Sequence, residues 1–338
     1  MTVLERAPLA PRTTLGVGGT ARFLVTVEGD DDVRTAIAFA QKQALPLRVL
    51  GAGSNVLIPD TMLDAVVVQL TLTDITITDE GETVLVHAAA GALWESVVML
   101  CEEHALWGIE NLAGIPGSVG GAAVQNIGAY GAELSSVFLY ADTIDSATGT
   151  TARILHEHAA LAYRSSFFKT HPALVITHVG LRLAKHALPN LSYPDLLRLH
   201  DTGAVLSTPR EIAQAVRMIR ANKFPANSGM GTAGSFFKNP VVDATLAAHL
   251  AELHPGLPQF PQADGRVKLP LAWILDHILG LKGYAYGSVR LFEKQPMVIV
   301  AERGATATEV DALVTMVCDR VYESIGITIE REVETFTV

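Results

Sequence analysis

An uncharged, glycine-dense stretch at residues 111–132 constrains this chain more than any other feature of its sequence. Its 22 residues match the roughly 20 that a helix needs to span a bilayer. Six glycines, one proline, one glutamine and two asparagines nevertheless make it a poor membrane helix, because they lower helix propensity and are costly in hydrocarbon. We therefore expect part of a globular protein whose backbone lies close to a ligand.

The composition indicates a folded protein with an acidic balance. The chain has 338 residues, 49% hydrophobic and 18% charged, which excludes disordered and collagen-like classes and fits two or three packed units. Its net charge of −10 opposes binding to nucleic acid or to anionic membranes. Residues 1–12 lack the basic start and apolar block of a signal peptide. Cys101 and Cys318 lie in apolar runs typical of structural thiols in a reducing compartment, so we predict a cytoplasmic protein.

Hydrophobic spacing predicts helices and strands without a regular alternation. The expected helices cover residues 31–43, 92–105, 209–222, 244–253, 271–279 and 308–324. The expected strands cover residues 47–50, 65–70, 83–90, 137–145, 174–183, 297–301 and 327–336. Thr308 and Asp311 have the spacing of a capping box, and Gly326 is expected to end that helix. The pattern of expected strands and helices gives way to a loop near residue 186, where we place a domain boundary.

Residues 50–57, LGAGSNVL, follow an expected strand and form the first candidate binding segment. Two glycines, a serine and an asparagine offer backbone N–H groups and side chains to a pyrophosphate. The segment lacks the third glycine of a dinucleotide fingerprint, and no helical pattern follows it, so a Rossmann fold is not indicated. An ordinary turn at the end of a strand would explain the same residues.

The glycine-dense stretch contains the second candidate segment. Four glycines between residues 114 and 121 would let the backbone approach a flat or phosphorylated ligand, and Gln125 and Asn126 add directional hydrogen bonds. Close packing of two helices is the alternative explanation. No Walker lysine follows either glycine segment, so a P-loop nucleotidase is not indicated.

Three further segments carry residues suited to chemistry. Arg164 lies among aromatic residues in YRSSFFK, where burial would require an anionic partner, although an exposed salt bridge fits equally well. Ser235 precedes two phenylalanines in GTAGSFFKNP, so we expect it to face a cleft or the core. Residues 327–334 place three glutamates on one face of an expected strand, typical of a solvated face. His156 and His158 have no third ligand at metal spacing, so no metal site is predicted.

Seven motifs, taken together, resemble one known family. They are, in order, TTLGVGGTARF, GAGSNVL, GIPGSVGGAAVQNIGAYGAE, YRSSFFK, GSFFKNP, LKGYAYGSV and IEREVE. In this order and with compatible spacing they resemble UDP-N-acetylenolpyruvoylglucosamine reductase of bacterial peptidoglycan synthesis, over nearly the whole chain. Residues 191–199, LSYPDLLRL, resemble the tyrosine-bearing insertion of one branch of that family.

The resemblance implies an α+β fold in three parts. An FAD-binding region of the vanillyl-alcohol-oxidase-like fold would consist of two α/β subdomains, at residues 1–70 and 71–222, with the tyrosine loop near 187–200. A smaller α+β substrate-binding domain would cover residues 223–338, and its last strand would return to the active site.

The resemblance also implies an activity and its catalytic residues. The family transfers hydride from NADPH to FAD and then to the enolpyruvyl group of a UDP-sugar, which gives UDP-N-acetylmuramate. By their places in the motifs, Arg164, Ser235 and Glu332 would be catalytic, with Glu330 as the alternative glutamate. Arg164 and a protonated Glu332 would stabilise an enolate, and Ser235 would supply the proton.

The same resemblance assigns binding residues and partners. The implied FAD ligands are Gly51, Ala52, Gly53, Ser54, Asn55, Ile115, Pro116, Gly117, Gly120, Gln125, Asn126, Gly128, Ala129, Gly131 and Gly234. The implied substrate ligands are Tyr193, Lys223, Asn239 and Gln295. We expect non-covalent FAD, because no histidine or cysteine lies in the glycine segments, with NADPH as hydride donor and a UDP-sugar as substrate. The expected protein is a monomer that binds neither nucleic acid nor membrane.

Two other functions remain open at this stage. One is a flavin-dependent oxidase of the same fold that acts on a sugar or alcohol. The other is a catalytically silent sugar-nucleotide binding protein, which the presence of Arg164, Ser235 and Glu332 disfavours.

Overall fold

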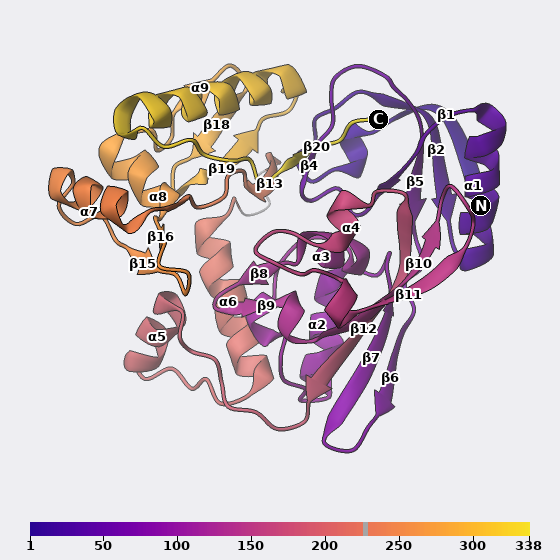
Figure 1. Ribbon diagram of the computed structural model, residues 1–338, viewed down its shortest axis with the longest axis horizontal. Coiled ribbons are helices and arrows are strands. Elements are labelled where there is room, and N and C mark those ends of the chain that lie inside the picture. Colours follow the sequence, from indigo (N-terminus) through magenta and orange to yellow (C-terminus); the bar gives the residue numbers. More distant parts are fainter. Residues whose placement is uncertain (226–228) are drawn as a thin grey trace.

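The computed structural model describes residues 1–225 and 229–338 (Figure 1). Its first sheet has the order β1-β2-β5-β3, with an antiparallel β1–β2 pair and parallel pairs of β5 with β2 and β3. These strands are β1 (Thr2–Pro8), β2 (Thr20–Val27), β3 (Leu47–Leu50) and β5 (Leu63–Leu70). Helix α1 (Asp30–Gln43) connects β2 to β3 and buries an apolar face of Val33, Ala36, Ile37 and Ala40.

The second sheet is antiparallel, in the order β11-β10-β12-β7-β6. Its strands are β6 (Ile75–Asp79), β7 (Thr83–Ala89), β10 (Phe138–Asp145), β11 (Thr151–Leu155) and β12 (Leu174–Ala184). The associated helices are α2 (Trp94–Glu103), α3 (Val119–Gln125), α4 (Phe167–Thr170), α5 (Pro194–Asp201) and α6 (Pro209–Lys223). A single hydrophobic core joins this sheet, the first sheet and α6.

The last third of the chain has a separate core and a third sheet, in the order β13-β19-β18-β17. These strands are β13 (Gly231–Ser235), β17 (Ala285–Tyr286), β18 (Val289–Phe292) and β19 (Gln295–Ala301). The strands β14 (Val241–Val242), β15 (Phe260–Pro261) and β16 (Val267–Lys268) form a small sheet. The helices here are α7 (Ala244–Leu253), α8 (Leu271–Trp273), which continues as a π-helix (Ile274–Ile278), and α9 (Ala307–Ile325).

The C-terminal segment follows helix α9 and returns to the N-terminal part of the molecule (Figure 1). Strand β20 (Glu334–Thr335) pairs in parallel with β4 (Val56–Leu57), directly after the first glycine segment. Strands β8 (Gly128–Ala129) and β9 (Ala132–Glu133) form a hairpin at the end of the second glycine segment. The fold therefore brings the end of the chain against the first glycine segment.

Two predicted elements are wrong in detail. The final strand, expected over 327–336, is limited to β20, because the preceding residues run along Phe237 and form one isolated bridge with it through Arg331. The capping box of the last long helix is formed by Thr306 and Glu309. Each of these residues lies two positions before the predicted one, Thr308 or Asp311. Asp311 instead pairs with Arg331.

Several elements have no counterpart in the sequence prediction. Strands β1, β2, β6 and β11 were not expected, and the short helix α3 lies inside the glycine-dense stretch. Ser118 caps α3 by accepting a hydrogen bond from Gly121 N at 3.3 Å. Among residues 1–225 and 229–338, no helix has the length and apolar character needed to cross a membrane. The domain limits at 70 and 222 stay predictions.

Candidate active site

A cavity of about 780 Å³ lies where the glycine segments, α6, β13 and the C-terminal segment meet. This volume is in the upper part of the roughly 300–1,000 Å³ range of small-molecule sites. Thirteen of the predicted FAD ligands line it: Gly51, Ala52, Gly53, Ser54, Asn55, Ile115, Pro116, Gly117, Gly120, Gln125, Gly128, Ala129 and Gly234. The two candidate segments therefore form one site.

The two glycine segments also pack against each other. A β-carbon at Gly51 would lie 2.7 Å from Ser118 Oγ, and one at Gly117 would lie 2.9 Å from Ser54 Oγ. Gly53 has φ +65°, and a β-carbon there would lie 2.2 Å from the carbonyl oxygen of Arg12. The glycines thus serve close contacts within the protein, as well as leaving backbone exposed to the cavity.

Asn126 and Gly131 do not line the cavity. Asn126 is fully buried, with φ +44°, and its amide donates to Ala162 O at 2.9 Å while its oxygen accepts from Ser135 N. Gly131 O accepts a hydrogen bond from Asn190 Nδ2 at 2.9 Å. Both residues hold loops around the site in place.

Arg164 lies at the tip of a tight turn closed by reciprocal backbone hydrogen bonds between Ala162 and Ser165. Its φ of +53° is uncommon for a residue other than glycine and costs roughly 1–2 kcal/mol. The side chain lines the cavity and donates from Nε to Glu332 Oε1 at 2.6 Å and from Nη2 to Gly128 O at 2.7 Å. The turn thus presents a guanidinium held by one carboxylate and one carbonyl.

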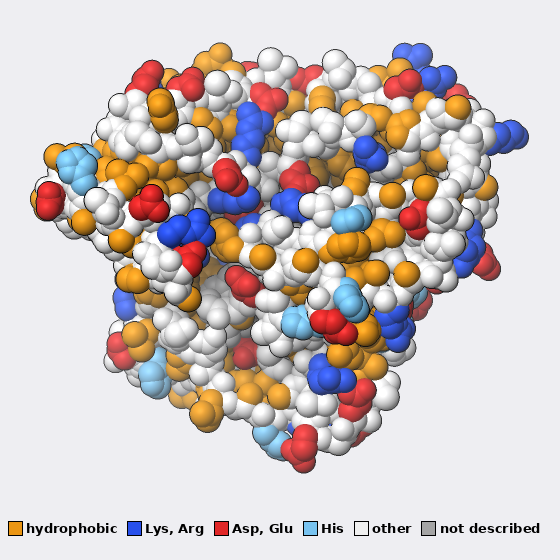
Figure 2. Space-filling model, in the orientation of Figure 1, with side chains coloured by type: hydrophobic (Ala, Val, Ile, Leu, Met, Phe, Trp, Pro, Cys, Tyr) orange, Lys and Arg blue, Asp and Glu red, His pale blue; other side chains and the backbone are white. Residues whose placement is uncertain are grey.

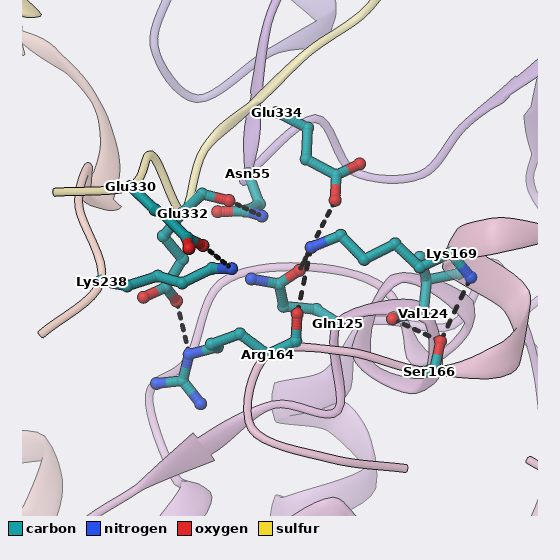
Figure 3. Close-up of polar contacts among 10 residues, drawn as sticks. All are labelled: Asn55, Val124, Gln125, Arg164, Ser166, Lys169, Lys238, Glu330, Glu332 and Glu334. Atoms are coloured by element: carbon teal, nitrogen blue, oxygen red, sulfur yellow. Dashed lines mark hydrogen bonds and ion pairs between the residues drawn. The ribbon is translucent and has the colours of Figure 1, made fainter. Parts of the chain in front are cut away.

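The two candidate glutamates occupy different environments. The Glu332 side chain is 14% exposed and lines the cavity, whereas that of Glu330 is 71% exposed and pairs with Lys238 at 2.8 Å (Figure 3). Glu332 N donates to Phe236 O at 2.9 Å, and Asn55 Nδ2 donates to Glu332 O at 3.3 Å. The geometry therefore places Glu332, rather than Glu330, beside Arg164.

Ser235 ends β13 and lines the same cavity. The pairing of β13 with β19 shifts register between Thr232 and Ser235, and Gly234 has φ +77° at this irregularity. Within the described parts of the chain, Ser235 Oγ has no hydrogen-bond partner, so the hydroxyl is free to bind a ligand.

Two of the predicted substrate ligands lie together beside the cavity. The rings of Tyr193 and Tyr130 meet edge to face at 4.9 Å, and Lys223 Nζ lies 5.6 and 5.8 Å from their centroids. Lys223 also pairs with Asp195. Burial raises the pKa of Asp195, but hydrogen bonds from Lys223 and Arg198 outweigh it, so the pKa lies below its usual value.

The other two predicted substrate ligands belong to the last third of the chain. Asn239 Oδ1 accepts a hydrogen bond from Leu271 N at 2.9 Å, at the start of α8. Gln295 begins β19, and its Oε1 is buried without a hydrogen-bond partner in the described structure. None of Tyr193, Lys223, Asn239 and Gln295 is among the cavity-lining residues.

Several charged residues at the site were not predicted from the sequence. Arg217, Arg220 and Glu334 line the cavity. Arg217 pairs with two glutamates of α2, whereas Arg220 donates from Nε to Gly114 O at 2.9 Å. The amphipathic spacing of α6 could have marked the inward positions of this helix, but not the ligand that they face.

Tyr130 packs beside this group. Burial is the main cause that raises the pKa of Tyr130 to about 12, so its phenol stays neutral. Tyr130 lies in the glycine-dense stretch, and its ring packs on that of Tyr193, 63 positions later in the sequence. The local sequence around Tyr130 does not predict this contact.

Neither cysteine is suited to nucleophilic chemistry. Burial raises the pKa of Cys101 to about 12, and it also raises the pKa of the half-buried Cys318. In residues 1–225 and 229–338, no three His, Cys, Asp or Glu side chains cluster at metal-binding distance. On the face shown in Figure 2, basic side chains are interspersed with acidic ones.

The site residues fit FAD. Gln125 lines the cavity, and its amide Nε2 is buried without a hydrogen-bond partner in the described structure. A flavin carries several hydrogen-bond acceptors that could satisfy this donor. Arg220 supplies a cation that can face an anionic group, and exposed backbone of two glycine segments lines the same wall.

Comparisons with known proteins agree with this fit. The profile of an FAD binding domain matches residues 21–155, and that of the C-terminal domain of UDP-N-acetylenolpyruvoylglucosamine reductase matches residues 225–336. The structure of 6-hydroxy-D-nicotine oxidase from Arthrobacter nicotinovorans is similar in fold, with a TM-score of 0.54 at 14% identity over 97% of this chain and 86% of that one. The fold and the cavity thus define an FAD-binding protein of the vanillyl-alcohol-oxidase-like class.

Closer relatives define the family. The chain is 38% identical to the UDP-N-acetylenolpyruvoylglucosamine reductase of Pseudomonas aeruginosa over 97% of both chains. It is 37% identical to that of Escherichia coli K12 over 96% of this chain and 94% of the relative. A crystal structure of the Thermus caldophilus reductase superimposes with a TM-score of 0.69, at 28% identity over 99% of both chains. The chain belongs to the UDP-N-acetylenolpyruvoylglucosamine reductase family.

Proposed function

We propose that the protein is an NADPH-dependent flavoenzyme that reduces UDP-N-acetylglucosamine enolpyruvate to UDP-N-acetylmuramate. One observation carries the proposal: Arg164, Ser235 and Glu332, from distant parts of the chain, line one cavity together with both glycine segments. This arrangement occurs in a member of the reductase family. The product would serve peptidoglycan synthesis, and hence cell-wall biogenesis, cell shape and cell division.

The chain's own residues supply charge and a proton. FAD held by the two glycine segments would supply the chemistry of hydride transfer from NADPH to the methylene carbon of the enolpyruvyl group. Negative charge would then develop on the neighbouring carbon and its carboxylate, where the Arg164 guanidinium stabilises it. The free hydroxyl of Ser235 would donate the proton to that carbon, which completes addition of H⁻ and H⁺ across the double bond.

The ion pair between Arg164 and Glu332 adds a condition to this mechanism. Arg164 Nε donates to Glu332 Oε1 at 2.6 Å, so we expect Arg164 to turn away from Glu332 when it binds the substrate carboxylate. Substrate binding would therefore exchange one carboxylate for another at Arg164. Gly128 leaves room for this movement, because a β-carbon there would lie 3.0 Å from Arg164 Nη1.

The substrate would enter beside the tyrosine loop. Tyr193, Lys223, Asn239 and Gln295 are proposed to contact the UDP-sugar, and Lys223 would supply positive charge for its diphosphate. In this structure the charge of Lys223 is satisfied by Asp195, so binding would require the pair to open or to share the ligand. Asn126 and Gly131 are proposed to shape the FAD site through the loops they hold.

The test compares two fates of the reduced protein. Protein reduced by NADPH without oxygen is mixed either with UDP-N-acetylglucosamine enolpyruvate or with oxygenated buffer. The proposal expects fast flavin reoxidation and UDP-N-acetylmuramate in the first mixture, with slow reoxidation in the second. Fast oxygen consumption without muramate would instead support a flavin oxidase acting on a sugar or alcohol.

The remaining partner assignments belong to the same proposal. We propose a cytoplasmic monomer with non-covalently bound FAD that binds neither nucleic acid nor membrane. Denaturation should release its yellow flavin into the supernatant, and size-exclusion chromatography should give one 36.0 kDa species.

A further inference from the structure

Lys169, the last residue of YRSSFFK, joins three parts of the site. Its Nζ donates to Gln125 Oε1 at 3.1 Å and to the carbonyl oxygen of Arg164 at 3.1 Å (Figure 3). It also contacts Glu334 Oε1 at 2.5 Å, as an ion pair without hydrogen-bond geometry. One ammonium group thus links helix α3, the turn that bears Arg164, and strand β20.

The contact with Gln125 selects one orientation of its amide. An ammonium group can only donate hydrogen bonds, so it requires the amide oxygen, rather than the NH₂ group, on its side. The NH₂ group therefore points away from Lys169 (Figure 3). Without Lys169 the amide could rotate and present its oxygen instead.

The NH₂ group so oriented lacks a partner. Gln125 is 7% exposed, and its Nε2 is buried without a hydrogen-bond partner in the described part of the chain. Gln125 also lines the cavity. A buried donor of this kind is costly unless a ligand supplies the acceptor, and FAD offers ring carbonyls, ring nitrogens and phosphate oxygens.

We propose that Lys169 is a positioning residue that fixes the Gln125 amide so that its NH₂ group donates to an acceptor of FAD. The inference rests on the proposed function, since it requires FAD in this cavity. Lys169 touches the cofactor through Gln125 alone in this account. Its hydrogen bond to Arg164 O also supports the left-handed backbone at that residue.

The test measures the dissociation constant for FAD by titration of apoprotein. Lys169→Met is expected to weaken FAD binding about tenfold, the effect of one lost hydrogen bond, and to shift the flavin absorption bands. Gln125→Leu should weaken binding to a similar extent. In the Gln125→Leu background, Lys169→Met should have no further effect, because the group on which it acts is gone.

Two matched variants separate positioning from general destabilisation. Lys185→Met removes a lysine from a surface ion pair with Asp79 and should leave FAD binding unchanged. Gln125→Glu keeps an oxygen for Lys169 but replaces the donor by a second acceptor, so it should weaken binding at least tenfold. This variant tests the inference even if Lys169→Met does not fold.

Three results would overturn the inference: wild-type affinity in Lys169→Met, wild-type affinity in Gln125→Glu, or additive losses in the double variant. Failure of the wild-type protein to bind FAD would instead overturn the proposed function. The two failures are therefore distinguishable in one titration series.

Discussion

The cavity wall of residues 50–57 and 114–121 and the tyrosine loop near 187–200 are held in the fold by different kinds of contact. The wall depends on glycines, whose missing β-carbons let the two segments approach within side-chain contact. The loop depends on side chains: Asn111 Nδ2 donates to Tyr130 O and Asn190 O, and Tyr193 packs on Tyr130. Backbone packing fixes the wall, whereas a few polar and aromatic groups hold the loop.

This difference suggests that the wall serves a resident cofactor and that the loop serves a ligand that comes and goes. A wall built by close backbone contacts has little freedom to rearrange. Contacts made by side chains such as Lys223 and Asp195 can open and re-form without moving the core.

The largest effect is expected at Ser235, whose hydroxyl would donate a proton to the substrate. Ser235→Ala should slow reoxidation of the reduced protein by substrate roughly 10²–10⁴-fold, because the proton donor is lost. Reduction by NADPH should stay within about twofold of wild type. Stopped-flow absorbance resolves both half-reactions, and near-normal reoxidation by substrate would remove Ser235 from the mechanism.

A second prediction concerns the stability of the wall. Gly53→Ala would combine a positive φ with a β-carbon 2.2 Å from Arg12 O, so it should lower the unfolding free energy by about 2 kcal/mol or more. Gly81→Ala is the matched control, since its φ is +87° and nothing lies within 4 Å of the added carbon. It should cost about 1 kcal/mol. Equal losses in urea denaturation would mean that close packing at Gly53 is unimportant.

The third prediction concerns the loop. Tyr193→Ala should raise KM for the UDP-sugar about tenfold, the effect of one lost ring contact, and leave the FAD dissociation constant unchanged. Tyr322→Ala, at an exposed position on α9, is the control and should change neither quantity. A parallel loss of FAD affinity in Tyr193→Ala would show that wall and loop act as one unit.

The smallest expected effect concerns Glu110, which precedes the loop anchor Asn111. Burial raises the pKa of Glu110, so the fold favours its neutral form. Its contribution to stability is complete below the usual pKa of 4.5 and is lost as the pH rises through the raised folded-state pKa. Glu110→Gln keeps an acceptor for Gly108 N and cannot ionise.

The melting temperature of Glu110→Gln should therefore exceed that of wild type by about 2 °C at pH 8. The difference should vanish near pH 4, where Glu110 is neutral in both states. Calorimetry at the two pH values checks this, and a constant difference would contradict the assignment to ionisation.

The sequence predicted the parts of the site that depend on local backbone. Glycine density and short motifs singled out both segments of the wall, and Arg164 and Ser235, which two other motifs marked, line the same cavity. It could not choose between Glu330 and Glu332, because an ideal strand puts both on one face. The chain instead bends at residues 332–333, before β20 begins, and only Glu332 pairs with Arg164.

Contacts between distant segments escaped the prediction for a physical reason. The roles of Lys169, Arg220 and Glu334 depend on which segments the tertiary fold brings together. Hydrophobic periodicity within one segment does not predict such contacts. The capping box was misplaced because Thr306 and Thr308 both stand three residues before an acidic residue. Tertiary contact with Asp60 occupies Thr308 and leaves Thr306 to cap the helix.

The measurement that tests the central claim most directly is a single turnover without oxygen. FAD-loaded protein is reduced by one equivalent of NADPH, mixed with UDP-N-acetylglucosamine enolpyruvate, and followed by flavin absorbance and by mass spectrometry of the product. The account predicts full reoxidation of the flavin with one equivalent of UDP-N-acetylmuramate. A flavin that stays reduced in the presence of this substrate, in protein that binds FAD, would contradict it.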